Sequence, residues 1–378
     1  MREINQVIEN TQVSVFAVMS KMAMDYGAIN LAQGYPDFEG PDFVIQRASE
    51  SFHLGKNQYA PYPGIPRLRT QLAALYKREH SLDCDPEGFT LTAGATEAIF
   101  CSISSLVNPG DEVILFEPYY DSYLTTVRLA GGIPKFVTLK KPDFSFTRED
   151  LEAVVSEKTK LVLFNNPHNP SGRVFSKEEL KILANFCIDY DLYCMSDEVY
   201  EFLIYDEAKH IPMISLPGMA ERTIGISSFG KTFGLTGWKL GWSYACPKLT
   251  TAIRMVHQFV TFSINHPLQL AMADSLENIG NYLKDFKSTY QQKRDFFHKE
   301  FRAKGFSLYP SQGTYFALCD ISQSGLSDVE YCEKLIKEKG VAAIPCSAFY
   351  SDSDEGKQLV RFCFAKKEET LRAASLKL

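Results

Sequence analysis

Short apolar runs alternate with amphipathic stretches from about residue 111 to residue 245, and this alternation limits the folds that the chain can adopt. An amphipathic stretch between two of the runs, residues 176–190, opens with Ser-Lys-Glu-Glu, the capping-box pattern of a helix start. Apolar strands that alternate with helices predict a largely parallel sheet. We therefore expect an α/β fold, in which ligands bind at the carboxyl ends of the strands. The four runs are Val113–Phe116, Lys160–Phe164, Leu192–Ser196 and Thr223–Ser227.

Polar and aromatic side chains follow these four runs, where the strands are expected to end. A pyridine aldehyde needs such a set: an aromatic face for stacking, a carboxylate that keeps the ring nitrogen protonated, an amide and a phenol for the ring oxygen, and a lysine that forms an imine with the aldehyde. Each residue alone has an ordinary structural explanation, such as Asp197 as a helix N-cap or Tyr120 as core packing. Together, in this order, they favour a common ligand. In chain order they are Tyr120, Asn169, Asp197, Tyr200 and Lys231.

The glycine-rich segment around Lys231 supports two interpretations. Residues 225–232 match G-x-x-x-x-G-K-T, the phosphate loop of nucleotide-binding proteins. That motif requires a helix after the lysine, whereas Gly234, Gly237 and Gly241 would each cost such a helix about 1 kcal/mol. We therefore favour a lysine that forms an imine over a nucleotide-binding site.

Two further features suit an anionic ligand. Ser228 and Lys239 flank the lysine, and a predicted strand-to-helix junction at residues 94–96 would direct free N–H groups and a helix dipole at a phosphate. Arg361 lies in an apolar run predicted to be a strand, where a guanidinium is costly unless it is paired. Its fork matches a substrate carboxylate, and an internal salt bridge is the alternative explanation.

Composition argues against several other classes of protein. The formal net charge of −6 disfavours sequence-independent nucleic-acid binding. No apolar run is long enough to span a bilayer, and the charged N-terminus is unlike a secretory signal. The nine cysteines form no C-x-x-C pair, which favours reduced thiols in a cytoplasmic protein. Neither they nor the seven histidines have metal-ligand spacing, so we expect no metal.

Seven segments spread over nearly the whole chain carry a family resemblance: Gln33–Phe38, Asn57–Tyr59, Gly94–Ala98, Asn166–Pro170, Ser196–Tyr200, Ser228–Thr232 and Arg361–Lys366. They resemble the class I aminotransferases, which are pyridoxal 5′-phosphate enzymes of fold type I. Three segments are similar to the kynurenine aminotransferase/glutamine transaminase K group, including its bacterial methionine aminotransferases: Thr92–Ala98, Tyr120–Tyr123 and Val341–Pro345. The resemblance implies a large domain, residues 31–270, with a mostly parallel seven-stranded sheet between helices. It also implies a small α+β domain, residues 271–378, joined by an N-terminal arm, residues 1–30.

The resemblance also implies roles at the cofactor. Lys231 would hold pyridoxal phosphate as an internal aldimine and then carry the proton between the substrate Cα and the cofactor C4′. Asp197 would pair with the ring nitrogen, Asn169 and Tyr200 would bond the ring oxygen, and Tyr120 would stack on the ring. The phosphate would be bound by Ala95, Thr96, Ser228, Lys239 and Tyr59 of the partner subunit. We therefore expect an obligate homodimer with shared active sites.

Substrate contacts are implied in the same way. The substrate carboxylate would bind Arg361, Asn169 and the Gly34 backbone. Aspartate-specific relatives use a second arginine from the partner chain, but residues 259–266 contain none. Such a pocket fits methionine or an aromatic amino acid such as kynurenine, which would give its amino group to a 2-oxo acid in a ping-pong reaction. Apolar pockets distinguish one methylene by only about 1–3 kcal/mol, so these donors stay unranked. The aromatic lining would come from Phe16, Tyr35, Tyr62, Tyr123 and Phe262.

Two alternatives share parts of this pattern. A β-lyase that splits the C–S bond of cystathionine or of cysteine conjugates would use the same cofactor and the same lysine. A non-catalytic protein could keep the cofactor site to sense amino acids. Such regulators carry an added DNA-binding module, and this chain has no basic segment for one.

Overall fold

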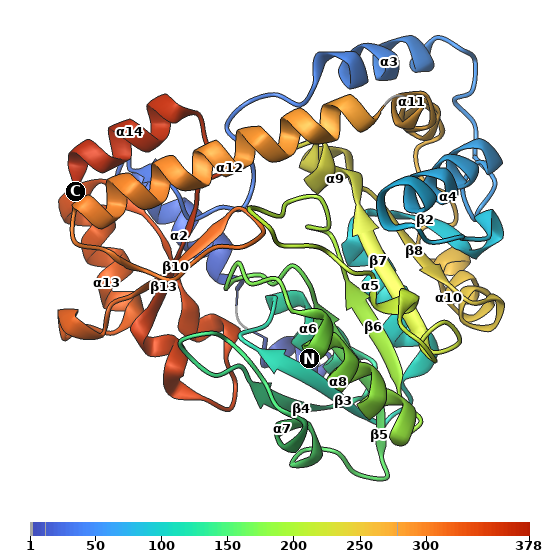
Figure 1. Cartoon of the computed structure of the whole chain (residues 1–378), viewed down its shortest axis with the longest axis horizontal. Helices are drawn as coiled ribbons and strands as arrows, with labels where there is room; N and C mark the ends of the chain where they lie inside the picture. The colour runs from blue at the N-terminus through green and yellow to red at the C-terminus, as the bar shows by residue number, and fades with distance from the viewer. Residues whose placement is uncertain (1–2, 12, 278) are drawn as a thin grey trace.

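A seven-stranded sheet forms the centre of the larger part of the molecule (Figure 1). The computed structural model describes residues 3–11, 13–277 and 279–378. The strand order is β2-β8-β7-β6-β5-β3-β4, and within the described residues only β8 runs in the direction opposite to the other strands. The mostly parallel seven-stranded sheet is therefore confirmed. The strands are β2 (Phe89–Ala93), β3 (Glu112–Glu117), β4 (Ile133–Thr138), β5 (Thr159–Asn165), β6 (Tyr193–Asp197), β7 (Thr223–Ser228) and β8 (Leu240–Ala245).

The four strands expected from the apolar runs are β3, β5, β6 and β7. The strands β4 and β8 were not expected. The edge strand β4 is only partly buried, so its sequence is not a continuous apolar run. The strand β8 directly follows the glycines of the lysine segment, and those glycines obscured the strand pattern.

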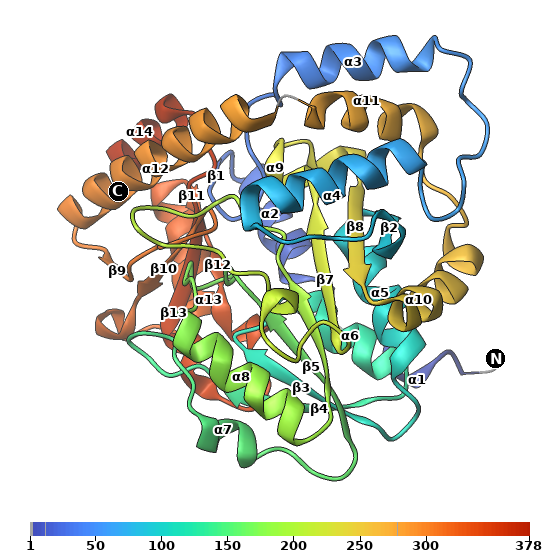
Figure 2. The same cartoon turned by 45° about the vertical axis from the view of Figure 1, so that its right-hand side comes forward.

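Helices cover both faces of this sheet (Figures 1 and 2). On one face lie α5 (Gly94–Leu106), α6 (Asp121–Leu129) and α10 (Pro247–Val260), and on the other lie α7 (Arg148–Glu152) and α8 (Lys177–Asp189). The alternation along β3 explains the layers, because successive side chains of a strand point to opposite faces. Val113 and Leu115 join the core beneath α5, whereas Ile114 and Phe116 join the core beneath α8.

Two helices that the sequence predicts are confirmed, together with the sequence features that predict them. The side chain of Ser176 caps α8 by accepting a hydrogen bond from the Glu179 N–H at 3.2 Å, and the Glu179 carboxylate accepts from the Ser176 N–H at 2.9 Å. The spacing of Leu68, Leu72, Leu75 and Tyr76 predicts a helix from Ile65 to Glu79, and helix α4 (Pro66–His80) buries that apolar face. Beside it, α3 (Asp42–Phe52) packs on α11 (His266–Leu276), as Figure 2 shows.

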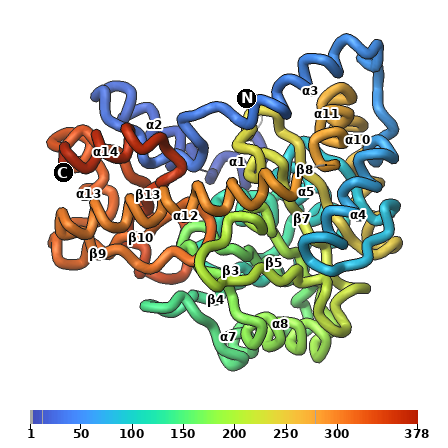
Figure 3. Tube along the Cα trace, turned by 45° about the horizontal axis from the view of Figure 1, so that its top comes forward, coloured from blue at the N-terminus to red at the C-terminus, as the bar shows by residue number. Residues whose placement is uncertain are grey.

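The smaller part of the molecule is built on a four-stranded antiparallel sheet with the order β12-β13-β10-β9. Its strands are β9 (Ser307–Leu308), β10 (Phe316–Asp320), β12 (Ile344–Pro345) and β13 (Leu359–Cys363). Around it lie α2 (Val15–Asp25), α13 (Asp328–Lys334) and α14 (Glu368–Lys377). Helix α12 (Ile279–Ala303) crosses from the larger part to the smaller one, as Figure 3 shows. The sequence predicts a long helix from about Leu276 to Lys304, but α11 ends at Leu276 and α12 begins at Ile279.

The N-terminal segment joins the smaller part of the molecule. The strand β1 (Ile29–Asn30) pairs in parallel with β11 (Val341–Ala342), and α2 contacts β11 and β12. Residues 29–38 predict a strand that runs into a Gly-Pro turn. The strand is only two residues long, and a loop follows it. Residues 11–26 predict a short helical arm. The structure has α2 there, preceded by the short helix α1 (Gln6–Glu9), and residue 12 lies outside the described residues.

Two expectations from composition concern the whole chain. All nine cysteines are free and eight of them are buried, as expected for reduced thiols. In the part of the chain that the structure describes, no helix is both long and apolar enough to cross a membrane.

Candidate active site

A cavity lies where β5, β6 and β7 end, beside the N-terminus of α5. This is the expected place, because ligands bind parallel sheets at the carboxyl ends of the strands. Its lining includes almost all the residues that we expected at the cofactor. The exception is Tyr59. Arg361, which we expect at the substrate carboxylate, is described below. The expected residues that line it are Ala95, Thr96, Tyr120, Asn169, Asp197, Tyr200, Ser228, Lys231 and Lys239.

Lys231 lies in α9 (Phe229–Thr232), a helix of four residues that directly follows β7. Its Nζ donates hydrogen bonds to the Tyr315 hydroxyl at 2.9 Å and to the Gly34 carbonyl at 3.4 Å. Burial lowers the pKa of Lys231 to about 8, and the nearby Arg361 guanidinium acts in the same direction. The lysine is therefore partly neutral, and hence nucleophilic, near neutral pH. Because α9 ends one residue after the lysine, the long helix of a phosphate loop is absent here.

The sequence alone did not point to Tyr315. Its hydroxyl donates to the Gly34 carbonyl at 2.6 Å, so the oxygen accepts the hydrogen bond from Lys231. Tyr315 directly precedes β10, in a run whose pattern predicts only an apolar strand. No local pattern marks it as a contact of the lysine. The hydrogen bond from Lys231 Nζ to the Gly34 carbonyl shows that this carbonyl faces the lysine amine.

Asp197 is the last residue of β6 and is almost fully buried. Its carboxylate accepts hydrogen bonds from the Tyr123 hydroxyl at 2.5 Å and from the Val199 N–H at 3.2 Å. Burial raises the pKa of Asp197 to about 6, although the hydrogen bond from Tyr123 and the charge of Lys231 oppose the rise. A cation at this site would favour the ionised form.

Tyr123 has a partner that the sequence does not predict. We expect it in the aromatic lining of the substrate pocket, and its hydroxyl donates to Asp197. Helix α6 begins at Asp121, directly after Tyr120, so its first turn directs Tyr123 at the end of β6. Tyr120 itself lines the cavity, and burial raises its pKa to about 12. Tyr200 is also buried, which raises its pKa, and its ring packs edge-on against Tyr315 with 5.3 Å between the centroids.

Arg361 in β13 is 1% exposed, and among the described residues no carboxylate lies within ion-pair distance of it. Its Nη1 donates to Asn169 Oδ1 at 2.8 Å and its Nη2 donates to the Ala32 carbonyl at 3.2 Å, but its buried Nε has no partner. The guanidinium lies 3.9 Å from the centroid of the Phe316 ring and 4.9 Å from that of Phe16. The internal salt bridge that we considered is therefore not found. The fork remains available for an anionic ligand.

Three elements form an anion cradle. Gly94 opens α5 with a φ of +72°, and a Cβ on Gly241 of β8 would lie 2.6 Å from the Gly94 carbonyl carbon. Only glycine at position 241 therefore lets β8 approach the helix start. The approach brings Lys239 Nζ to 3.5 Å from Thr96 Oγ1. At the third element, Ser228 caps α9 by accepting from the Gly230 N–H at 3.2 Å.

Several expected residues lie away from this cavity. Tyr59 is 80% exposed and packs on Phe262 with 5.2 Å between the ring centroids. Tyr35 and Tyr62 are also exposed. Of the expected aromatic lining, Phe16 contacts the site directly, because its ring packs on Tyr120 and on Arg361.

The chain was compared with known proteins. Residues 26–377 match the family model described as aminotransferase class I and II. The chain belongs to this family. It is 42% identical to the methionine aminotransferase of Escherichia coli over 97% of this chain and 95% of that protein. It is 39% identical to a kynurenine–oxoglutarate transaminase of Dictyostelium discoideum over 96% of this chain and 92% of that protein. A crystal structure of an E. coli methionine aminotransferase superposes with a TM-score of 0.96 at 40% identity, covering 100% of this chain and 99% of that one.

This family of aminotransferases depends on pyridoxal 5′-phosphate. The residues in the cavity fit that group. A buried lysine has a lowered pKa, a buried carboxylate lies at the end of the next strand, and an anion cradle opens α5. Among the described residues, the buried donor Arg361 Nε has no hydrogen-bond partner.

Proposed function

We propose that this aminotransferase moves the amino group of methionine, or of an aromatic or other apolar amino acid, to a 2-oxo acid by a ping-pong reaction. The observation that carries the proposal is the fork of Arg361, which has no acidic partner in the described part of the chain and is packed between aromatic rings close to Lys231. The fork suits the α-carboxylate that all these donors share. Phe16 beside it suits an apolar side chain. The methionine and kynurenine aminotransferases among the relatives support the same donors.

The roles of the cofactor residues belong to this proposal. Bound pyridoxal phosphate supplies an electron sink for the carbanion at the substrate Cα. Lys231 takes the Cα proton in its neutral form and returns it, which its lowered pKa permits near neutral pH. Asp197 holds a proton on the ring nitrogen, while Asn169 and Tyr200 bind the ring oxygen. Tyr120 supplies the stacking face. The phosphate is held by Ala95, Thr96, Ser228 and Lys239.

A homodimer is part of the same proposal. Tyr59, which we expect at the phosphate, lies outside the cavity of its own chain. Its ring packs on Phe262, and other exposed apolar side chains lie near Phe262 in the sequence, namely Met255, Phe259 and Val260, of which Phe259 is 86% exposed. Exposed patches of this kind mark protein interfaces. We propose that a second copy covers the patch and that Tyr59 of the partner subunit completes each phosphate site.

The domain division and the compartment are also proposals. We place the domain boundary near residue 270 and assign residues 1–30 to the small domain. The pairing of β1 with β11 supports that assignment. The free thiols suit a reducing compartment, so we place the enzyme in the cytoplasm.

The test follows the first half-reaction in the absorbance of the bound cofactor. Amino acids are added singly to the purified holoenzyme. Methionine, phenylalanine, tyrosine or kynurenine should convert the spectrum, whereas aspartate should not. An Arg361→Ala variant should keep the cofactor spectrum but require far more methionine, and a Lys231→Ala variant should lose turnover. Release of pyruvate and thiol from cystathionine without any amino acceptor would replace the proposal with a β-lyase.

A further inference from the structure

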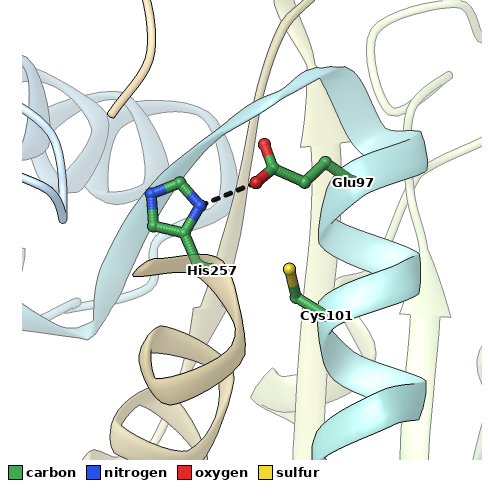
Figure 4. A group of neighbouring side chains, drawn as sticks. All are labelled: Glu97, Cys101 and His257. Carbon is green, nitrogen blue, oxygen red and sulfur yellow. Dashed lines mark hydrogen bonds and ion pairs between the residues drawn. The ribbon is translucent and has the colours of Figure 1, made fainter. Parts of the chain in front are cut away.

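Glu97, Cys101 and His257 form a buried cluster outside the cofactor cavity (Figure 4). Glu97 lies in the first turn of α5, two residues after Ala95 of the anion cradle, and His257 lies in the last turn of α10. His257 Nδ1 is 2.8 Å from Glu97 Oε1, and its Nε2 is 2.7 Å from the Tyr62 carbonyl oxygen. Both ring nitrogens are thus engaged. Burial also raises the pKa of the Cys101 thiol to about 12. The cluster is therefore built as a hydrogen-bonded link, and a metal would have to break it.

The chemistry of the link follows from its partners. A carbonyl oxygen only accepts, so His257 Nε2 donates to Tyr62. Burial favours the neutral form of Glu97, but hydrogen bonds from His257 and from the Ala93 N–H outweigh it, and the pKa of Glu97 is lowered overall. The carboxylate therefore also accepts. His257 thus bridges α5 to the loop of residues 57–64.

The same histidine organises a second segment. Its backbone carbonyl accepts hydrogen bonds from the N–H groups of Thr261 and Phe262, which form the turn after α10. Phe262 then packs edge-on against Tyr59, the exposed tip of the 57–64 loop. The side chain of His257 thus holds the loop that carries Tyr59, and its backbone holds the turn that carries Phe262, the ring on which Tyr59 packs.

We propose that Glu97 and His257 are positioning residues that hold the Tyr59 loop against the helix of the anion cradle, so that each subunit's pair sets the cofactor affinity of the opposite subunit's site. This inference rests on the proposed dimer, in which Tyr59 of the partner subunit reaches the phosphate. It assigns no contact with the cofactor to His257. The pair acts only through the placement of Tyr59.

The first test is a double-mutant cycle on the dissociation constant of pyridoxal phosphate from the apoenzyme, measured by cofactor absorbance. Tyr59→Phe and His257→Leu should each weaken binding about 10-fold or more, which corresponds to the loss of about one hydrogen bond to a charged group. The double variant should bind pyridoxal phosphate no more weakly than the single variant that has the lower affinity. If the two losses of affinity multiply in the double variant, the positioning role is overturned, but the proposal of a dimer is not. No effect of Tyr59→Phe would overturn both the pair's role and the sharing of Tyr59.

Glu97 supplies a conservative control. In Glu97→Gln the amide can donate to a neutral His257 Nδ1 and its carbonyl can still accept from Ala93, so the link to Tyr62 survives. Binding should stay within about threefold of wild type, whereas Glu97→Ala should match His257→Leu. Equal losses for Gln and Ala would overturn the positioning role. Should His257→Leu fail to fold, His257→Gln replaces it, because a single amide cannot reach both partners.

Hybrid dimers separate an effect on the opposite site from an effect within the same chain. A subunit with Lys231→Ala and His257→Leu is paired with a wild-type subunit, so that the only lysine able to capture cofactor faces the defective Tyr59 loop. We expect weakened capture in this hybrid and near-normal capture when Lys231→Ala and His257→Leu are on different subunits. The reverse pattern would show that His257 acts on its own cradle and would overturn the proposal.

Discussion

Replacing Tyr123 with phenylalanine tests the electrostatics of Asp197. The variant keeps the ring but removes the hydroxyl that donates to the buried carboxylate at 2.5 Å. A hydrogen bond to a charged group contributes about 1.5–3 kcal/mol and one pKa unit corresponds to about 1.36 kcal/mol, so the pKa of Asp197 should rise by about 1–2 units. It would then move from about 6 to about 7–8, and the carboxyl would be partly neutral at neutral pH.

The assay is the pH dependence of pyridoxal phosphate binding to the apoenzyme, because affinity for the free protein reports the pKa values of the free protein. The acid limb should move upward by about 1–2 pH units relative to wild type, and titration of the cofactor itself cancels in that comparison. Tyr119→Phe is the matched control, since its hydroxyl contacts Ser351 at 2.6 Å instead of a carboxylate. An acid limb that stays in place in Tyr123→Phe, or moves equally in the control, would refute the reasoning.

The sign of the linked stability change is also fixed. The pKa of Asp197 is raised in the folded chain, from 3.8 to about 6, so the folded apoenzyme binds more protons than the unfolded chain between these values. The free energy of unfolding therefore falls as the pH rises through that window. In Tyr123→Phe the fall should continue to higher pH, which thermal unfolding of the apoenzyme at several pH values would detect.

Three further predictions concern other parts of the chain. Arg361→Lys should raise the KM for methionine by about 10–100-fold, because an ammonium cannot replace the guanidinium fork; an unchanged KM in steady-state kinetics would contradict this. Tyr315→Phe removes a hydrogen-bond acceptor of the Lys231 ammonium, so the pKa of Lys231 should fall below about 8. The pH midpoint of cofactor capture should then decrease, and an increase would contradict the assignment. Ser176→Ala should lower the free energy of unfolding by about 1 kcal/mol in urea without changing cofactor affinity.

Much of the active site could be predicted from the sequence, because its residues follow buried strands directly. The residues that directly follow a strand lie at the edge of the sheet, and this placement does not depend on the rest of the chain. Asn169, Asp197 and Lys231 were found in this way, and all line one cavity. Local signals also predicted the capping box of α8, since N-cap chemistry depends only on residues within one turn.

The parts that sequence did not predict depend on contacts between distant segments. Tyr315 meets Lys231 across 84 positions, and His257 meets Glu97 across 160, so no local pattern announces either pair. The contact between Tyr123 and Asp197 was also not predicted, because the start of α6 decides which way the first turn faces. The sequence by itself determined which chemical groups reach the sheet edge, since strand periodicity is local. Only the tertiary structure decided their hydrogen-bond partners and pKa values, because burial and charge depend on everything that packs around them.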